Sequence, residues 1–393
     1  MNGKFRLMGL CLLVAALALP TTLFAGGSSE SGASGPVKLS IIDVAGNLQL
    51  SQPAIEAFKA ANPKIVSDIE YVKLTAPELV AKIKAQQMAN NMVTTLVLTG
   101  YDAMSAGVVQ NIYEQLMPKY KDVFQKSIDN YVSGAKGAYD LFNGYGITYT
   151  FCPGGPMFNY NPTKVANPPK TAAELLAWAK ANPGKFMYAR PANSGPGRAF
   201  LMGLPFILGD KDPKNPATWD KTWAYLKDLD QYIDYYPSGT SITFKEMGEG
   251  TRWIIASHVG WDVNQRVLGV IPPSYKGFLL DNTTFVTDAH FMAIPKGLDP
   301  AREKATIALM QWLMQPKEQA VTFDDGYFWP GPSIKGVTLD MAPQAEQDKL
   351  KSFVDMGFES KVDALPTTTQ LGPEAMVQSF DMWDKLVGSK VKK

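Results

Sequence analysis

Hydrophobic and polar residues follow strand-like patterns at three places in the first hundred residues. Residues 37–43 (VKLSIID) alternate, residues 69–74 form a second such run, and residues 94–98 (TTLVL) are almost wholly apolar. A nearly continuous apolar run is expected where both faces of a strand are covered. The pattern therefore predicts three strands, the third of them buried on both faces.

Helix signals separate these strands. Pro53 suits the first turn of one helix, which Asn62 and Pro63 would end. Thr75 and Glu78 form a capping box (T-x-x-E) ahead of a second helix. The order strand, helix, strand, helix, strand predicts an α/β fold with a parallel, doubly wound sheet.

The ends of these strands carry the first candidate site residues. Asn47 follows the first strand, and Tyr101 and Asp102 follow the third. Ligands of such sheets bind beyond the carboxyl ends of the strands, so we expect these three residues at one rim. For Asp102, capping of the following helix is the alternative.

A second α/β unit follows a break at residues 153–156 (PGGP). Strands are predicted at residues 145–151, 186–189, 253–259 and 285–294, and the last of them returns to the first unit. The predicted domains are a first lobe (residues 37–150 plus about 290–335), a second lobe (151–289) and a helical C-terminal segment packing on the lobes (336–393).

The N-terminal residues have a different character. Lys4 and Arg6 precede an apolar stretch at residues 7–19, and the small Ala25 offers a cleavage point. This pattern is typical of a secretory signal peptide (residues 1–25), with an uncleaved anchor as the alternative. No cysteine stands at the cleavage point, so we expect a secreted chain without a lipid anchor. Residues 26–36, rich in Gly and Ser, predict a flexible leader.

Charge and cysteine content exclude some functions. The formal charge is +1, and loss of Lys4 and Arg6 with the signal peptide gives +1 − 2 = −1. A near-neutral chain without a basic block argues against nucleic-acid binding. Cys152 is the only cysteine outside the predicted signal peptide, so no intramolecular disulfide is expected and a large core must supply the stability.

Two stretches resemble the extracellular solute-binding proteins of ABC importers. In residues 157–188, an apolar strand ends in Tyr160-Asn161 and a Pro-Pro-x-Thr motif (residues 168–171) opens a helix. Residues 291–320 contain a strand that ends in Ile-Pro-Lys-Gly, then a helix with a Pro-x-x-Gln-Ala ending. The piece ANPGKF within the first stretch is most similar to the polyamine- and thiamine-type binding proteins.

This resemblance implies a type II periplasmic-binding-protein fold. Its two α/β lobes, joined by hinge strands, would close on a small solute outside the cytoplasmic membrane. The closed protein would present that solute to an ABC permease in the inner membrane, and no cofactor would be needed.

Residues 189–204 (ARPANSGPGRAFLMGL) carry the next candidates. The two glycines lack the third one of a dinucleotide-binding motif. The free N–H groups of the helix that opens here would suit an anionic group, with Ser194 and Gly195 in contact. Arg198 opposes the helix dipole unless an anion lies nearby. A tight turn with a solvated arginine is the alternative.

Trp261 and Asp262 follow a predicted buried strand. An aromatic face beside a carboxylate suits a small cation or a flat ring. In the resembling family a residue near this position commonly faces the cleft. The alternative is an interface tryptophan, with Asp262 paired to Arg266.

The returning strand carries Asp288 and His290. Polyamine-binding relatives have an acidic residue where Asp288 stands, and a tryptophan two residues before it, where this chain has Val286. That departure weakens a polyamine assignment. His290 is interpreted as a hinge or core histidine, and the loop at residues 324–332 (DDGYFWPGP) as packing.

No pattern indicates catalysis or a metal. The chain has two histidines and neither H-E-x-x-H nor G-x-S-x-G. We predict a monomeric binding protein for a small polar organic solute that is polyamine-like, thiamine-like or zwitterionic. The carboxylates favour an amine and Arg198 an anionic group; a zwitterion or an amine-bearing phosphate would satisfy both. The alternatives are a secreted hydrolase of small polar substrates and an extracellular interaction protein without a cleft.

Overall fold

The computed structural model describes residues 35–354 and 365–388. The predicted signal peptide and all but the last two residues of the predicted leader lie outside the described residues. Within them, every helix is too short or too polar to cross a lipid bilayer.

The first three strands form the parallel arrangement that the sequence predicts. β1 (Val37–Asp43) lies between β2 (Val66–Lys73) and β3 (Leu96–Thr99) and pairs in parallel with both. The capping box of the second helix is confirmed, because the Glu78 carboxylate accepts the backbone N–H of Thr75 at 2.8 Å. The three helices of this region are α1 (Asn47–Ala61), α2 (Ala76–Met88) and α3 (Tyr101–Val109).

The start of α1 differs from the prediction. Pro53 lies inside the helix and not in its first turn, because α1 begins at Asn47. Ala45 and Gly46 adopt positive φ angles of 80° and 78° and turn the chain directly after β1. The Asp43 carboxylate then accepts the backbone N–H of Asn47 at 2.7 Å, which fixes the helix start.

The larger sheet is mixed and not wholly parallel. Its strand order is β10-β4-β9-β3-β1-β2, with β11 beside β9. β9 (Phe285–Ala293) is antiparallel to β3 and to β4 (Ile147–Gly155). The prediction of a parallel sheet therefore holds for β1 to β3 but not for β9 and β4 beside them. β9 returns from a distant part of the chain, so no βαβ crossover sets its direction.

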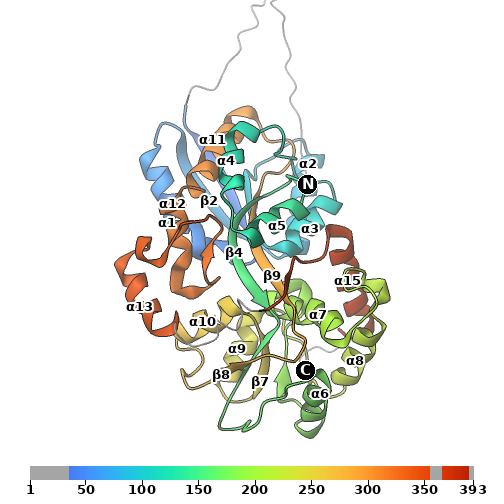
Figure 1. Cartoon of the computed structure of the whole chain (residues 1–393). Helices are drawn as coiled ribbons and strands as arrows, with labels where there is room; N and C mark the ends of the chain where they lie inside the picture. Colours follow the sequence, from blue (N-terminus) through green and yellow to red (C-terminus); the bar gives the residue numbers. More distant parts are fainter. Residues whose placement is uncertain (1–34, 355–364, 389–393) are drawn as a thin grey trace, which may run out of the picture. The chain divides into compact units, whose positions relative to one another are not determined.

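The chain leaves the larger sheet at the predicted Pro/Gly break. β4 ends at Gly155, and β5 (Met157–Tyr160) begins the smaller sheet, whose order is β6-β7-β5-β8. β4 and β9 run side by side, as Figure 1 shows. The other strands are β6 (Phe186–Met187), β7 (Ile254–Ser257), β8 (Lys276–Phe278), β10 (Gly331–Pro332) and β11 (Thr367–Thr368).

Membership of the two sheets changes at slightly different residues from the predicted lobe limits. β4 stays in the larger sheet as far as Gly155, and β9 already belongs to it at Phe285. The predicted second lobe spans residues 151–289. The lobe limits therefore remain a prediction.

Helices surround both sheets. Asp299 caps α11 by accepting the backbone N–H groups of Ala301 and Arg302, and Thr171 caps α6 by accepting that of Glu174. The remaining helices are α4 (Lys121–Asp129), α5 (Ser133–Leu141), α6 (Ala172–Ala181), α7 (Gly195–Leu208), α8 (Asp220–Asp230), α9 (Thr240–Gly248), α10 (Val259–Val267), α11 (Pro300–Leu313), α12 (Pro316–Gln319), α13 (Gln344–Val354) and α15 (Pro373–Leu386). Short 3₁₀ turns are η1 (Pro191–Asn193), η2 (Pro216–Thr218), η3 (Ala320–Gly326) and η4 (Leu339–Met341).

The hydrophobic core includes the C-terminal helix α15. This helix packs on α3, which follows a strand of the larger sheet. Its Trp383 also packs edge-on against Tyr188 and Tyr236, in the part of the chain that builds the smaller sheet. Burial of so large an aromatic side chain contributes several kcal/mol.

Candidate functional site

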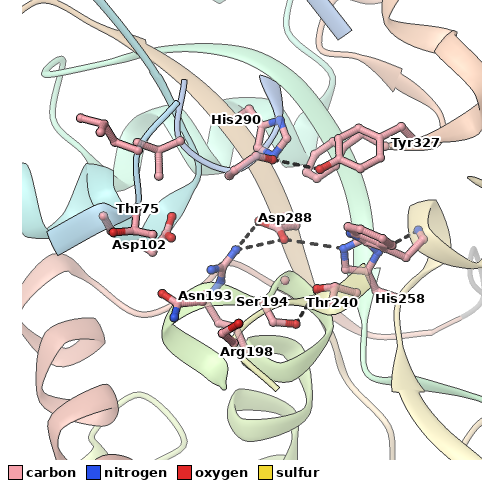
Figure 2. Close-up of a pocket in the computed structure, with 18 residues that line it drawn as sticks. Thr75, Asp102, Asn193, Ser194, Arg198, Thr240, His258, Asp288, His290 and Tyr327 are labelled. Carbon is pink, nitrogen blue, oxygen red and sulfur yellow. Dashed lines mark hydrogen bonds and ion pairs between the residues drawn. The ribbon is translucent and has the colours of Figure 1, made fainter. Parts of the chain in front are cut away.

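A cavity of about 200 Å³ lies among segments that follow the strands of both sheets. Figure 2 shows the side chains that line it. On the side of the larger sheet its lining includes Ala45, Thr75, Asp102, Asp288, His290, Tyr327 and Phe328. On the side of the smaller sheet it includes Asn193, Ser194, Gly195, Arg198, Ser238, Thr240, His258 and Trp261. The binding region therefore draws on segments far apart in the sequence.

Five helices begin at this cavity. The lining contains residues at the N-cap or in the first turn of α2, α3, α7, α9 and α10. A helix N-terminus carries about half a positive charge, and its first N–H groups have no acceptor inside the helix. The cavity is therefore surrounded by partial positive charge from the backbone.

Arg198 and Asp288 form a buried ion pair at the cavity, with exposed fractions of 4% and 3%. Nη2 of Arg198 donates to both carboxylate oxygens at 3.2 Å, the long end of the range for such bonds. Asp288 also accepts hydrogen bonds from the backbone N–H of Ala289 and from Nε2 of Gln370. Burial raises the pKa of Asp288, and the charge of Arg198 opposes that rise.

Four buried side-chain polar atoms of the lining lack a hydrogen-bond partner within the described part of the chain. They are Asp102 Oδ1, Arg198 Nε, His258 Nε2 and His290 Nδ1. We refer to them as the open polar atoms. A buried polar group without a partner destabilises a protein by about 1–3 kcal/mol, so an occupant that supplied partners here would be bound favourably.

His258 is the N-cap of α10 and lines the cavity beside Asp288. Its Nδ1 accepts the backbone N–H of Trp261 at 3.4 Å. Burial, followed by the charge of Arg198, lowers the pKa of His258 to about 3, so the ring is neutral at pH 7. Because Nδ1 is the acceptor, the proton resides on Nε2, which lies 3.9 Å from Asp288 Oδ2.

An aromatic wall closes part of the cavity. Trp261 stacks on Phe244 with ring centres 5.8 Å apart and meets Tyr327 edge-on at 5.5 Å. His290 stacks on Phe328 at 4.1 Å. Burial also lowers the pKa of His290 to about 3. A flat or cationic group could pack against these ring faces.

Asp102 brings a second carboxylate. It lies in the first turn of α3, and Oδ1 is one of the open polar atoms. Burial raises its pKa, and the charge of Arg198 opposes that rise. The alternative of helix capping by Asp102 is wrong, because Gly100 is the N-cap of α3 and no side chain of the described residues caps this helix.

Six of the nine predicted site residues line the cavity: Asp102, Ser194, Gly195, Arg198, Trp261 and Asp288. Ser194 also caps α7, accepting the backbone N–H of Gly197 at 3.1 Å, and its hydroxyl is 2.7 Å from that of Thr240. The solvated arginine considered for Arg198 does not occur, because this side chain is buried.

The other three predicted residues, Asn47, Tyr101 and Asp262, do not line the cavity. Asn47 supports the turn after β1, since its side chain donates to the Val44 carbonyl at 2.9 Å. Tyr101 is fully buried between Phe142 and Phe291. Both follow strand ends as expected, but their side chains serve the fold around the site.

Asp262 follows the alternative that the sequence left open. Its Oδ1 accepts hydrogen bonds from Nε and Nη2 of Arg266, at 3.0 and 2.7 Å. Nδ2 of Asn159 donates to the same oxygen. Oδ1 of Asp262 is therefore engaged three times within the protein, and the residue lies outside the cavity lining.

Several lining residues were missed by the sequence analysis. His258 directly follows the end of β7, and that position could have marked it. Ser238 and Thr240 carry no such signal, because a loop precedes α9 and not a strand. Tyr327 and Phe328 lie in the loop interpreted as packing; they pack and also line the cavity.

The chemistry of the cavity suits binding. Within residues 35–354 and 365–388, no three His, Cys, Asp or Glu side chains are placed to hold a metal ion. Burial raises the pKa of the Cys152 thiol to about 12, which keeps it protonated. What the cavity offers is a set of donors, two carboxylates and aromatic faces.

Comparison with known proteins places the chain among binding proteins. Residues 53–352 match the sequence profile of the bacterial extracellular solute-binding proteins. The curated protein YnjB of Escherichia coli K12 is 26% identical over 199 residues, which cover 47% of this chain and 50% of that protein. The chain thus matches about half the length of this curated relative.

Solved structures show the same fold at low identity. A putative spermidine/putrescine ABC transporter protein from Listeria monocytogenes has a TM-score of 0.61 at 12% identity, covering 89% of this chain and 98% of that one. AfuA from Actinobacillus pleuropneumoniae, with fructose-6-phosphate bound, gives 0.62 at 14%, covering 90% and 99%. A periplasmic thiamin binding protein gives 0.62 at 15%, covering 90% and 96%. The predicted two-lobe α/β fold is confirmed.

Proposed function

Because the chain belongs to the bacterial extracellular solute-binding proteins, we propose that it captures a small polar solute in the cavity described above. It would work outside the cytoplasmic membrane, as a monomer and without a cofactor, and deliver the solute to the permease of an ABC importer. A solute that contacts both sides of the cavity stabilises the closed arrangement of the lobes. Population shift towards that arrangement is the expected mechanism.

One observation supports this proposal above the others: the cavity collects the open polar atoms from both sides of the molecule. Asp102 and His290 belong to the larger-sheet side, and Arg198 and His258 to the smaller-sheet side. An occupant that contacts both groups binds the closed state better than an open one. About 5.5 kcal/mol of such preference moves a 1:99 equilibrium to 99:1.

The solute belongs to one of three classes: a polyamine-like amine, a thiamine-like compound or a zwitterion. The structural neighbours named above are described with spermidine/putrescine, fructose-6-phosphate and thiamin. Those solutes differ widely in charge, so the fold alone selects none of them. The choice must come from this chain's own residues.

Binding is favoured over hydrolysis by the partners of the polar side chains. The Ser194 hydroxyl lies 2.7 Å from that of Thr240 and accepts the N–H of Gly197, so its hydrogen-bond partners are not histidines. A histidine that acts as a general base needs one ring nitrogen directed at a nucleophile. In His258, Nδ1 is already used to cap the helix. These contacts serve a fixed cavity, and no observation favours a nucleophile–base pair.

A thermal-shift panel of the three solute classes tests the proposal. A true solute at one hundred times its Kd stabilises the folded protein by about 2.7 kcal/mol, a shift of several degrees in Tm. The shift should vanish in Arg198→Lys and persist in Arg302→Lys, which changes a partly exposed arginine outside the cavity. NMR of the mixture should show the solute unchanged; turnover would refute a pure binding function.

A further inference from the structure

We infer that the solute of this cavity is zwitterionic, with an anionic carboxylate or phosphate group held at Arg198 and His258 and an ammonium group held at Asp102. The inference rests on the proposed function and names the solute class for that same site. It follows from matching each open polar atom to the partner that it needs.

The first step concerns the donors. Arg198 Nε and the protonated His258 Nε2 are open polar atoms on nearly fully buried side chains. The N-terminus of α7 adds the backbone N–H of Gly195, because Pro196 has none and Ser194 accepts that of Gly197. These groups require acceptor oxygens, and an anionic group also gains from the helix dipoles.

A polyamine cannot supply these acceptors. Its nitrogens are protonated donors at pH 7, so Arg198 Nε and His258 Nε2 would stay unsatisfied in the complex. Its positive charge would also lie beside the guanidinium group of Arg198. The donors therefore argue against the polyamine class that the sequence had allowed.

The second step concerns the acceptor. Asp102 Oδ1 is an open polar atom and needs a donor from the solute. Figure 2 shows Asp102 and His258 on opposite sides of Arg198. An ammonium group at Asp102 would pair with a buried carboxylate, whereas a second anionic group there would be repelled. The two ends of the solute therefore carry opposite charges.

The volume of the cavity suits a short solute. A water molecule occupies about 30 Å³ of liquid, so 200 Å³ holds roughly seven water-sized groups. Short ω-amino acids and phosphoethanolamine are of this size. The amino acids carry a carboxylate and phosphoethanolamine carries a phosphate, so a comparison of their affinities identifies the anionic group that the site prefers.

Isothermal titration calorimetry of the purified chain provides the test. The probes are β-alanine, 4-aminobutyrate and phosphoethanolamine, with butyrate, butylamine and putrescine as analogues that carry one kind of charge. At least one zwitterion should bind ten times or more tightly than every analogue. The better of the carboxylate and phosphate probes then identifies the anionic group.

Variants assign the two ends of that zwitterion. Asp102→Asn should weaken its binding tenfold or more but weaken its des-amino analogue less than threefold. Arg198→Lys should also weaken binding of the zwitterion tenfold or more, but it should weaken binding of the amine-only analogue less than threefold. Asp122→Asn is the matched control, because Asp122 lies in the first turn of α4 and outside the cavity lining. Circular dichroism verifies that each variant is folded.

The outcomes separate the two proposals. If putrescine or butyrate binds as tightly as the best zwitterion, or if Asp102→Asn affects both analogues equally, the zwitterion inference is overturned while solute binding stands. If neither these probes nor any solute of the wider thermal-shift panel binds, the proposed function fails as well.

Discussion

Two buried arginine–aspartate pairs of this chain differ in how fully their hydrogen bonds are used. In Arg266–Asp262, Nε and Nη2 of the arginine both donate to the carboxylate, and Nη1 donates to the carbonyls of Pro273 and Tyr275. In Arg198–Asp288, Nη2 alone donates to the carboxylate, at 3.2 Å, and Nε is an open polar atom. Both arginines are almost fully buried.

The difference assigns the two pairs different roles. The saturated pair, Arg266–Asp262, joins segments of the fold, here α10 and the loop before β8, and every nitrogen of its guanidinium group donates a hydrogen bond within the protein. The undersaturated pair, Arg198–Asp288, lies at the cavity, and Nε of Arg198 remains available to donate to an occupant. Net stability from a buried pair is small, but removal of one partner leaves a buried charge and is strongly destabilising.

The largest expected effect is the loss of stability when the saturated pair, Arg266–Asp262, is broken. Asp262→Ala leaves the guanidinium of Arg266 buried without its carboxylate, and the free energy of unfolding should fall by about 3–5 kcal/mol. Urea denaturation followed by tryptophan fluorescence measures the loss. Solute affinity of the folded fraction should change less than threefold, because Asp262 does not line the cavity.

Two controls sharpen this prediction. The double variant Asp262→Leu with Arg266→Met should recover at least half of the lost stability, because no buried charge remains. Arg198→Met should destabilise less than Asp262→Ala, since Asp288 keeps its bonds from Ala289 and Gln370 and its raised pKa favours protonation. Equal losses for Asp262→Ala and Arg198→Met would contradict the distinction between the pairs.

The two pairs also show what sequence could and could not predict. Arg266 stands four residues after Asp262 in a helix, so their pairing was foreseeable, and it was the alternative considered. Arg198 and Asp288 lie 90 residues apart, and only the fold brings them together. The capping box at Thr75 and Glu78, the parallel order of β1 to β3 and the Pro/Gly break depend on local sequence and were predicted correctly.

Side-chain direction limited the prediction of the site. Asn47 and Tyr101 follow strand ends as expected, yet their side chains turn into the core, whereas that of Asp102 reaches the cavity. Neighbouring residues in a helix point about 100° apart, so a helix start cannot show which one meets a ligand. The mixed sheet escaped prediction for a similar reason, since β9 pairs through tertiary contacts.

A smaller effect on stability is expected from a substitution that fills the space beside the undersaturated pair. A Cβ on Gly195 would lie 2.8 Å from Asp288 Oδ2 and 2.9 Å from His258 Nε2, too close for either. Gly195→Ala should therefore destabilise the protein by about 1–3 kcal/mol through overpacking and also weaken solute binding. Calorimetric titration and urea unfolding measure the two effects.

Gly239→Ala is the matched control for Gly195→Ala, since Gly239 also stands at the start of a helix. No heavy atom of the described residues lies within 4 Å of a Cβ built on Gly239. A loss of about 0.5 kcal/mol from poorer capping is expected there, with affinity unchanged. If Gly195→Ala bound solute as well as Gly239→Ala does, the gap at Arg198–Asp288 would have no part in binding.

The smallest effect is the pH dependence of stability contributed by the two histidines beside the undersaturated pair. Burial lowers the pKa of His258 and His290 to about 3 from the usual 6.5. Between these values the unfolded chain binds protons that the folded chain does not, so this stability is complete above pH 6.5 and is lost as the pH falls towards 3. Each histidine contributes at most about 1.4 kcal/mol per pH unit.

The test is urea unfolding at pH 6.5 and 5.5. The free energy of unfolding should fall less steeply with pH in His258→Asn, which keeps an N-cap acceptor, than in the wild type. Arg266→Met should keep the full slope, because both histidines of the chain line the cavity and neither joins the saturated pair. An equal slope in wild type and His258→Asn would mean that this histidine is not buried neutral beside Arg198, and the donor assigned to its Nε2 would be lost with it.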